Sequence, residues 1–332
     1  MDQSKQSFPT ILAARWNPHP TEQNKSMYEH QSVLSPTGAQ LSLWTCPVSG
    51  TAKGVVQICH GLGEHAERYA RFAEALSVAG YAVYAEDHRG HGKTTAPDAP
   101  AGFFARAEGW NQVLADKAFI NQYIHEQHPD LPVILFGHSL GGTLAFSYAL
   151  RWPQSINAVA VWNATTNTNA LHTVLNGVLA IEKLFRGRQA TSIVNALTFA
   201  QWGKAIKPHR TDFDWLSQDE AEVDKYIADP LCGWPAQVAL WQDISDGMAD
   251  CADNTKLSAL PKKLPFNLVG GDQDPATEGG KAVLDLDHRL KANGFENVTT
   301  KVMANTRHET LNELDRDQTT KDFIAWLDQI GQ

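Results

Sequence analysis

The segment VILFGHSLGG, residues 133–142, constrains the fold of this chain more than any other. Val133 to Phe136 are β-branched or bulky apolar residues, as expected of a strand that is buried on both faces of a sheet. The apolar residues after Ser139 recur at helical spacing, so a helix is expected to begin at the serine. Glycine–x–serine–x–glycine between a strand and a helix is typical of a nucleophile elbow, which exposes a strained serine at the end of the strand. The segment therefore predicts an α/β fold with a reactive serine at one edge of its sheet.

The order of segments along the chain supports this fold class. Strand-like and helix-like segments alternate from Val55 to Ala164, which predicts a parallel sheet with helices on both faces. Tyr28–Ser35 and Leu41–Val48 are joined by a turn sequence and are expected to form an antiparallel edge. Helix-like segments alone follow, and the alternation resumes at Phe266. We therefore expect an α/β core of residues 1–164 and 262–332, with a helical insertion of residues 165–261.

Composition limits the classes of partner and compartment. The net charge of −9 over 332 residues argues against nucleic acid and against docking on anionic lipid. No run of about 18 apolar residues is long enough to span a membrane, and the N-terminus is a poor signal peptide, so we expect a cytoplasmic protein. The four cysteines lack metal-site spacing and are expected to be buried free thiols, although a Cys232–Cys251 bridge is an alternative.

A serine nucleophile requires a histidine to take its proton and an acid to orient that histidine. In an elbow fold these partners follow the serine in the order acid, then histidine, on loops after later strands. Asp272 and Asp274 follow the strand-like segment FNLVGG, and both are candidates for the acid. His288 lies inside a helix-like segment, where a solvated position is expected, whereas His308 follows a strand. His308 is therefore the predicted base.

The oxyanion of the reaction requires two hydrogen-bond donors. The backbone N–H of Leu140 lies next to the nucleophile at the expected start of a helix. The loop HGLGEH, residues 60–65, follows an earlier strand, and its glycines allow the backbone to approach the serine. The N–H of Leu62 is therefore the second predicted donor.

Six segments of the chain resemble the monoglyceride lipase and bacterial lysophospholipase branch of the α/β-hydrolases: HGLGEHAERY, EDHRGHGKT, GHSLGG, DPLCGW, GDQDP and RHETLNE. The resemblance runs from about Tyr28 to the C-terminus. It implies an eight-stranded, mostly parallel sheet, a helical lid over residues 165–261, and hydrolysis of a single-chain glycerolipid ester without a metal or other cofactor. Carried over residue by residue, it assigns these roles: Ser139 as nucleophile, Asp274 as acid, His308 as base, and Leu62 and Leu140 as oxyanion donors. The chain departs from the family after its sixth expected strand, where it reads WNATTNTNA instead of an apolar stretch ending in proline.

The apolar content of residues 165–261 predicts a substrate with one long acyl chain, a monoacylglycerol or a lysophospholipid, and transient membrane contact through the lid. Two alternatives use the same scaffold: an acyltransferase, and a lidded aminopeptidase of the proline-iminopeptidase type. The aminopeptidase would need a lid carboxylate to hold the substrate ammonium, and the candidates are Glu182, Asp219, Glu220 and Glu222.

A dinucleotide-binding oxidoreductase is a remote alternative. Residues 61–66 fit G-x-G-x-x-A, and Glu86 and Asp87 follow about 20 residues on. Glu64 and Glu67 argue against this reading, because they would meet the pyrophosphate. Five histidines on expected loops could suggest a metal cluster, but most are expected to be hydrogen-bonded loop supports: His60, His65, His88, His91 and His138.

Overall fold

The computed structural model describes residues 27–168 and 170–330. Its centre is an eight-stranded sheet with the strand order β1-β2-β4-β3-β5-β6-β7-β8. Only β2 runs antiparallel to its neighbours; β3 to β8 are parallel to one another. The strands are β1 (Glu29–Leu34), β2 (Gln40–Cys46), β3 (Gly54–Cys59), β4 (Tyr81–Glu86), β5 (Val133–His138), β6 (Ala158–Trp162), β7 (Phe266–Gly271) and β8 (Val298–Met303). The mostly parallel sheet of eight strands and its antiparallel edge are confirmed.

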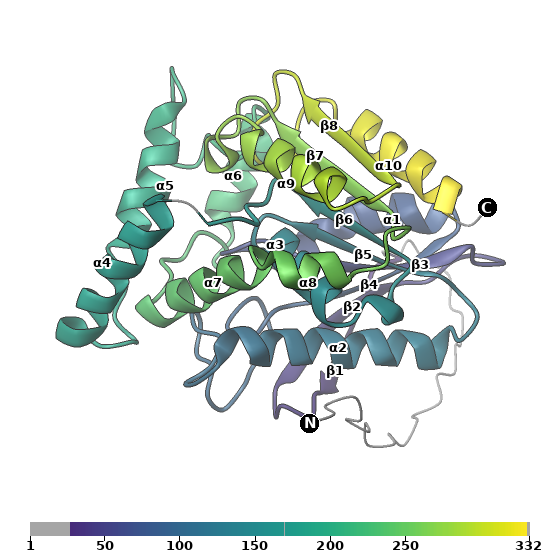
Figure 1. Cartoon of the computed structure of the whole chain (residues 1–332), viewed down its shortest axis with the longest axis horizontal. Helices are drawn as coiled ribbons and strands as arrows, with labels where there is room; N and C mark the ends of the chain where they lie inside the picture. Colours follow the sequence, from purple (N-terminus) through teal and green to yellow (C-terminus); the bar gives the residue numbers. More distant parts are fainter. Residues whose placement is uncertain (1–26, 169, 331–332) are drawn as a thin grey trace.

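Helices cover both faces of the sheet (Figure 1). One face packs against α1 (Ala70–Val78) and α10 (Arg316–Ile330) through a core that includes Val56, Phe136 and Trp162. The other face packs mainly against α2 (Gly109–Gln127), α3 (Leu140–Arg151) and α9 (Lys281–Ala292). Every residue of β3, β5, β6 and β7 is buried, as a sheet covered on both faces requires. The α/β core also contains short 3₁₀ helices: η1 (Ala66–Tyr69), η2 (Pro153–Ser155), η3 (Pro275–Thr277) and η4 (Thr310–Asn312).

The chain between β6 and β7, residues 165–261, is called here the helical segment. Its described residues form α4 (Ala170–Arg186), α5 (Val194–Ala205), α6 (Glu220–Ala228), α7 (Val238–Cys251) and α8 (Asn254–Ala259). Among the described residues of this segment, the only β-type pairing is an isolated bridge between Thr191 and Gln237. Figure 1 shows α4 and α5 on the side of the molecule that lies farthest from the sheet. The helical character of this region agrees with its sequence, whereas its role as a lid stays a prediction.

All four cysteines are buried and free, so Cys232 and Cys251 do not form a bridge. Within the described ranges, no helix combines the length and apolar character that a membrane span requires.

Candidate active site

Ser139 lies at the sharp turn between β5 and α3, with backbone angles φ 56° and ψ −123°. Such a positive φ is uncommon for a residue with a side chain and stores strain. The surrounding glycines are required by close approach. A Cβ atom on Gly137 would lie 2.1 Å from the carbonyl oxygen of Gly141, and one on Gly141 would lie 1.9 Å from the carbonyl oxygen of Cys59. The glycines thus allow strand, turn and helix to pack closely around the serine.

Three side chains from separate loops form a continuous hydrogen-bonded chain at the carboxyl edge of the sheet. His308 Nε2 lies 2.9 Å from Ser139 Oγ, and His308 Nδ1 lies 2.9 Å from Asp274 Oδ2. Asp274 follows β7 and His308 follows β8, so the parallel topology carries both to the edge where β5 presents the serine. Asp274 and His308 are both buried.

The carboxylate of Asp274 is held from several directions. Its oxygens accept hydrogen bonds from the backbone N–H of Ala276 at 2.9 Å, the amide of Asn163 at 3.0 Å and the hydroxyl of Thr277 at 2.7 Å. Burial raises the pKa of Asp274, but His308, Asn163 and Thr277 lower it more, so the net pKa lies below its ordinary value. The carboxylate therefore stays ionised and can stabilise a positive charge on His308.

Asp272 and His288, the other candidates for the acid and the base, lie elsewhere. Asp272 is exposed, and its carboxylate accepts the backbone N–H of Thr306 at 3.3 Å. His288 lies on α9 with its side chain exposed, as predicted. Of the two acids that the sequence left open, the structure brings only Asp274 to His308.

The loop after β3 lies directly against the serine. A Cβ atom on Gly61 would be 3.3 Å from Ser139 Cβ, so the backbone that leads to Leu62 passes beside Ser139. His60 Nδ1 donates to the carbonyl oxygen of Gly61 at 2.8 Å, which fixes the peptide plane that also carries the Leu62 N–H. Leu140 is the first residue of α3, where backbone N–H groups have no acceptor within the helix. The two predicted oxyanion donors thus flank Ser139 in the fold.

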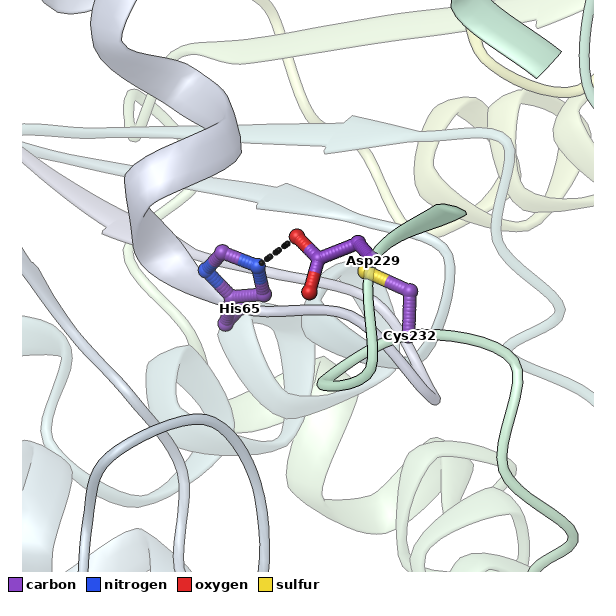
Figure 2. Close-up of side chains that lie close together, drawn as sticks. All are labelled: His65, Asp229 and Cys232. Carbon is purple, nitrogen blue, oxygen red and sulfur yellow. Dashed lines mark hydrogen bonds and ion pairs between the residues drawn. The ribbon is translucent and has the colours of Figure 1, made fainter. Parts of the chain in front are cut away.

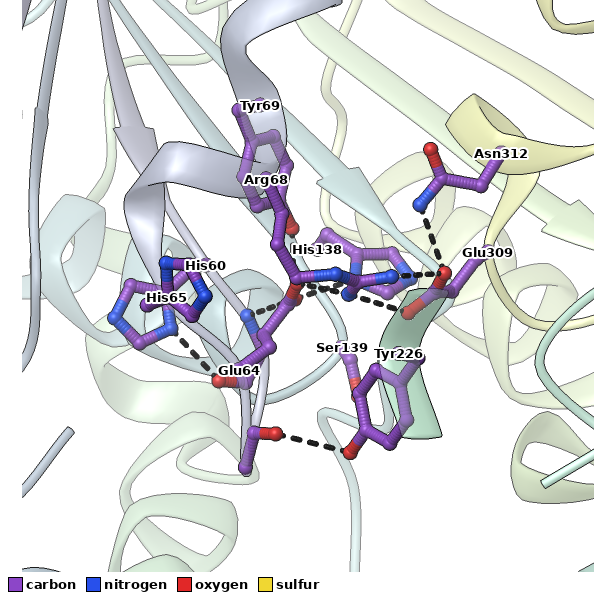
Figure 3. Close-up of polar contacts among 12 residues, drawn as sticks. His60, Glu64, His65, Arg68, Tyr69, His138, Ser139, Tyr226, Glu309 and Asn312 are labelled. Atoms are coloured by element: carbon purple, nitrogen blue, oxygen red, sulfur yellow. Dashed lines mark hydrogen bonds and ion pairs between the residues drawn. The ribbon is translucent and has the colours of Figure 1, made fainter. Parts of the chain in front are cut away.

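Glu64 has a position that sequence reasoning missed. Its carboxylate is buried and accepts the backbone N–H of Gly61 at 2.6 Å (Figure 3). This contact supplies a further reason against a nucleotide site, because the side chain occupies the loop amide that a phosphate would use. In the sequence, Glu64 is visible only as an acidic residue within a glycine loop, which argues against dinucleotide binding but does not predict this contact.

The loop histidines contact one another and the backbone. His88 Nε2 donates to the carbonyl oxygen of His60 at 2.8 Å, and the His88 N–H donates to His60 Nε2 at 2.9 Å. His91 Nδ1 donates to the carbonyl oxygen of Arg89 at 3.1 Å. Burial lowers the pKa of these three histidines, to about 4 for His91, so each is neutral. These contacts are those of hydrogen-bonded loop supports.

One group of potential metal ligands occurs among the described residues: His65, Asp229 and Cys232, whose ligand atoms lie within 4.8 Å of one another (Figure 2). His65 Nε2 is already hydrogen-bonded to Asp229 Oδ2 at 2.8 Å. Burial raises the pKa of the Cys232 thiol, which disfavours the thiolate that binds metals. The group is accounted for as a contact between the loop after β3 and the helical segment.

The helical segment also contacts the loop that carries His308. The N–H of His308 donates to the carbonyl oxygen of Trp215 at 3.3 Å, and the two rings lie 4.8 Å apart. Among the tryptophans of the helical segment, Trp215 is thus placed at the site, although nothing in the sequence distinguished it from Trp202, Trp234 and Trp241.

The carboxylates that an aminopeptidase would need in this segment have other partners. Glu182 binds Arg186, Asp219 binds Arg316 and caps α6, and Glu222 binds Arg71 and Lys225. Glu220 is exposed and lies 3.7 Å from Arg210.

Comparison with known proteins shows the family to which the chain belongs. A family model described as serine aminopeptidase, S33 matches residues 50–315. The chain is 27% identical to the monoacylglycerol lipase of Mycolicibacterium smegmatis over 83% of this chain and 88% of the relative, and 26% identical to mouse monoglyceride lipase over 82% of each. Its structure resembles a thermostable carboxyl esterase from Bacillus coagulans in complex with glycerol, with a TM-score of 0.81, 26% identity, and coverage of 92% of this chain and 99% of that one. The chain therefore belongs to the serine aminopeptidase S33 family of α/β-hydrolases, in its monoglyceride lipase branch, and is an ester hydrolase.

Proposed function

We propose that this hydrolase cleaves the ester bond of a monoacylglycerol or a lysophospholipid through an acyl-enzyme on Ser139. The observation that carries the proposal is the hydrogen-bonded chain from Ser139 through His308 to Asp274 at a strained elbow. A serine hydroxyl becomes a nucleophile when a neighbouring imidazole accepts its proton, and the buried carboxylate holds that imidazole in the required tautomer.

In the reaction, Ser139 Oγ attacks the carbonyl carbon of the ester while its proton passes to His308 Nε2. The oxyanion that forms accepts hydrogen bonds from the N–H groups of Leu62 and Leu140. His308 then gives the proton to the departing alcohol, and the acyl chain remains on the serine. A water molecule, deprotonated by His308, releases the fatty acid and restores the free hydroxyl. Ionised Asp274 stabilises the imidazolium in both halves of the reaction. These steps need no metal and no nucleotide.

The substrate class is supported by the relatives and by the helical segment. The two relatives cited above are named for monoacylglycerols, and the esterase of similar fold was solved with glycerol. The candidate carboxylates for a substrate ammonium have basic partners, which favours an ester over a peptide. We infer that residues 165–261 act as the lid, since their backbone contacts the loops that carry Leu62 and His308.

The outer face of this lid supports transient contact with lipid. Leu184 and Phe185 on α4 are each 78% exposed. Other large apolar side chains are exposed nearby on the same helix or at α5: Val174, Ile181, Ile193 and Leu197. We call these six residues the apolar lid face. A contiguous exposed apolar patch marks an interaction surface on a soluble protein, and we propose that these six residues form one. Because the chain carries a net charge of −9, a zwitterionic or neutral surface fits better than an anionic one.

The test combines a variant with a substrate series. Ser139→Ala is expected to lower kcat by about 10⁶ with folding unchanged, and a fluorophosphonate probe should label the wild type and not the variant. Glycerol monoesters of increasing chain length, a lysophosphatidylcholine and an aminoacyl anilide are then compared by kcat/KM. We expect kcat/KM to rise from short to longer monoesters, because each buried CH₂ contributes about 0.8 kcal/mol. Labelling of another residue would refute the nucleophile. Fast cleavage of the anilide without activity on glycerolipids would make the protein a peptidase.

A further inference from the structure

Three buried ionisable side chains and the half-buried Arg68 meet near Ser139 (Figure 3). We call these four residues the charge cluster: Glu64, Arg68, His138 and Glu309. Arg68 donates to both carboxylate oxygens of Glu309, at 2.7 and 2.8 Å, and to Glu64 Oε2 at 2.6 Å. His138 Nδ1 lies 3.4 Å from Glu64 Oε1. None of the steps of the proposed reaction uses these groups.

The charge cluster holds the chain neighbours of all three reactive groups. His138 directly precedes Ser139 and Glu309 directly follows His308. Gly61 directly precedes Leu62, and its N–H donates to Glu64 Oε1 at 2.6 Å. A further hydrogen bond joins two of these chain segments directly: His138 Nε2 donates to the carbonyl oxygen of His308 at 3.0 Å. Three loops that are far apart in the sequence are thus fixed relative to one another at one point.

We propose that the charge cluster is a positioning device for the hydrolysis, with Glu64 as its central residue: it sets the Leu62 N–H, Ser139 and His308 at their working distances. The proposal rests on the proposed function, because it takes these three groups as the oxyanion donor, nucleophile and base. A displacement of about 1 Å in such groups can lower the rate about 100-fold. Glu64 and its partners are therefore positioning residues, which act through their neighbours.

The charges of the cluster balance only when His138 carries a proton. Its Nε2 donates to a carbonyl and its Nδ1 faces a carboxylate, so both ring nitrogens act as donors, as in an imidazolium. With the two glutamates ionised and Arg68 charged, the protonated ring brings the sum to zero. Little solvent screens these charges, because Glu64, His138 and Glu309 are buried and the pocket beside them has a volume of only about 20 Å³.

Other groups near His138 leave this balance unchanged. Burial raises the pKa of Tyr69, which donates its hydroxyl to Glu64 and stays neutral. His60 is neutral, as described above. Arg71 lines the same small cavity but pairs with Glu222. The ring of His308 lies 5.0 Å from that of His138, so a positive charge on His138 is close to the predicted base.

The pH dependence follows from this arrangement. Burial lowers the pKa of His138, but the hydrogen bond and charge of Glu64, together with Glu309, raise it more, so the net pKa lies above its ordinary value. As pH rises through that pKa, the cluster loses one positive charge beside the developing oxyanion, so the rate should fall. Removing the charge of Glu64 lowers the pKa of His138, so the same fall should occur at lower pH.

The experiment uses the full chain with p-nitrophenyl butyrate, a short soluble ester that does not depend on lipid binding. Glu64→Gln is expected to lower kcat by about 10- to 100-fold and to change KM by less than about 2-fold. The fall of kcat/KM at high pH, the alkaline limb of the pH profile, should move to lower pH. Glu182→Gln is the matched control, since Glu182 is equally buried and also accepts from an arginine four residues on, a hydroxyl and a backbone N–H. It should lower the unfolding temperature to a similar extent and leave kcat and the pH profile unchanged.

Two outcomes overturn the proposal: a folded Glu64→Gln variant with unchanged kcat and alkaline limb, or a Glu182→Gln variant with the same kinetic defect. If the Glu64→Gln variant does not fold, the pH profile of the His138→Gln variant tests the proposal instead. Glutamine can still donate to the His308 carbonyl but cannot take a proton, so loss of the alkaline limb supports the proposal and an unchanged profile overturns it. Ser139→Ala is measured in parallel. Activity in that variant refutes the proposed function itself, which distinguishes the two failures.

Discussion

At the scale of single residues, the choice between Asp272 and Asp274 gives a direct prediction. Asp274→Asn should lower kcat by about 10⁴, because an amide stabilises the wrong tautomer of His308 and cannot stabilise its imidazolium. Asp272→Asn should change kcat by less than about 2-fold, since its exposed carboxylate only accepts from Thr306. The two variants are compared by steady-state kinetics on one ester, with circular dichroism to confirm folding. The reverse ranking of the two variants would exclude Asp274 as the acid.

Residues that the motifs name directly could be placed from the sequence, whereas residues that act through backbone contacts could not. The sequence indicates Ser139 and His308 because the elbow pattern and the order of the chain leave few alternatives, and the structure brings the two side chains within 2.9 Å. From the sequence, Glu64 only argues against a bound phosphate, because HGLGEH does not show that its carboxylate accepts the backbone N–H of Gly61. Trp215 was indistinguishable from three other tryptophans for the same reason: its contact with His308 depends on how the helical segment packs.

At the scale of elements, the space around each glycine predicts whether alanine can replace it. Gly141→Ala should destabilise the protein by about 3 kcal/mol or more, because the new Cβ would lie 1.9 Å from the backbone carbonyl of Cys59, in a core that cannot yield. Gly177→Ala lies within α4 with open space around the new atom, and should stabilise the helix by about 1 kcal/mol. Urea unfolding of both variants measures the difference. Equal effects would mean that the close packing of β3, β5 and α3 is not what the elbow requires.

The elements of the core could be predicted because their periodicities are strong and their order follows the rules of parallel sheets. The buried strands read as continuous apolar runs, and the antiparallel edge as two segments around a turn. The expected helix after HGLGEH is divided into η1 and α1, since hydrogen bonding and not apolar spacing decides where a 3₁₀ turn gives way to an α-helix. For the helical segment, the sequence predicts helices but not their arrangement, because amphipathic faces alone do not say which neighbour they meet.

At the scale of the whole molecule, substitutions in the apolar lid face should weaken lipid binding without changing the rate of ester hydrolysis. Burying one leucine or phenylalanine side chain in lipid contributes about 1.5–3 kcal/mol. The double variant Leu184→Ser and Phe185→Ser should therefore weaken binding to phosphatidylcholine vesicles by more than about 10-fold, measured by co-sedimentation. Activity on p-nitrophenyl butyrate should stay unchanged, because both side chains are largely exposed and α4 lies on the side of the molecule farthest from the sheet. Leu34→Ser is the control, since Leu34 is also well exposed but lies on the edge strand β1. If all three proteins bind vesicles equally, the apolar lid face does not meet lipid. If the double variant loses activity on the soluble ester as well, these residues support the active site from within the lid.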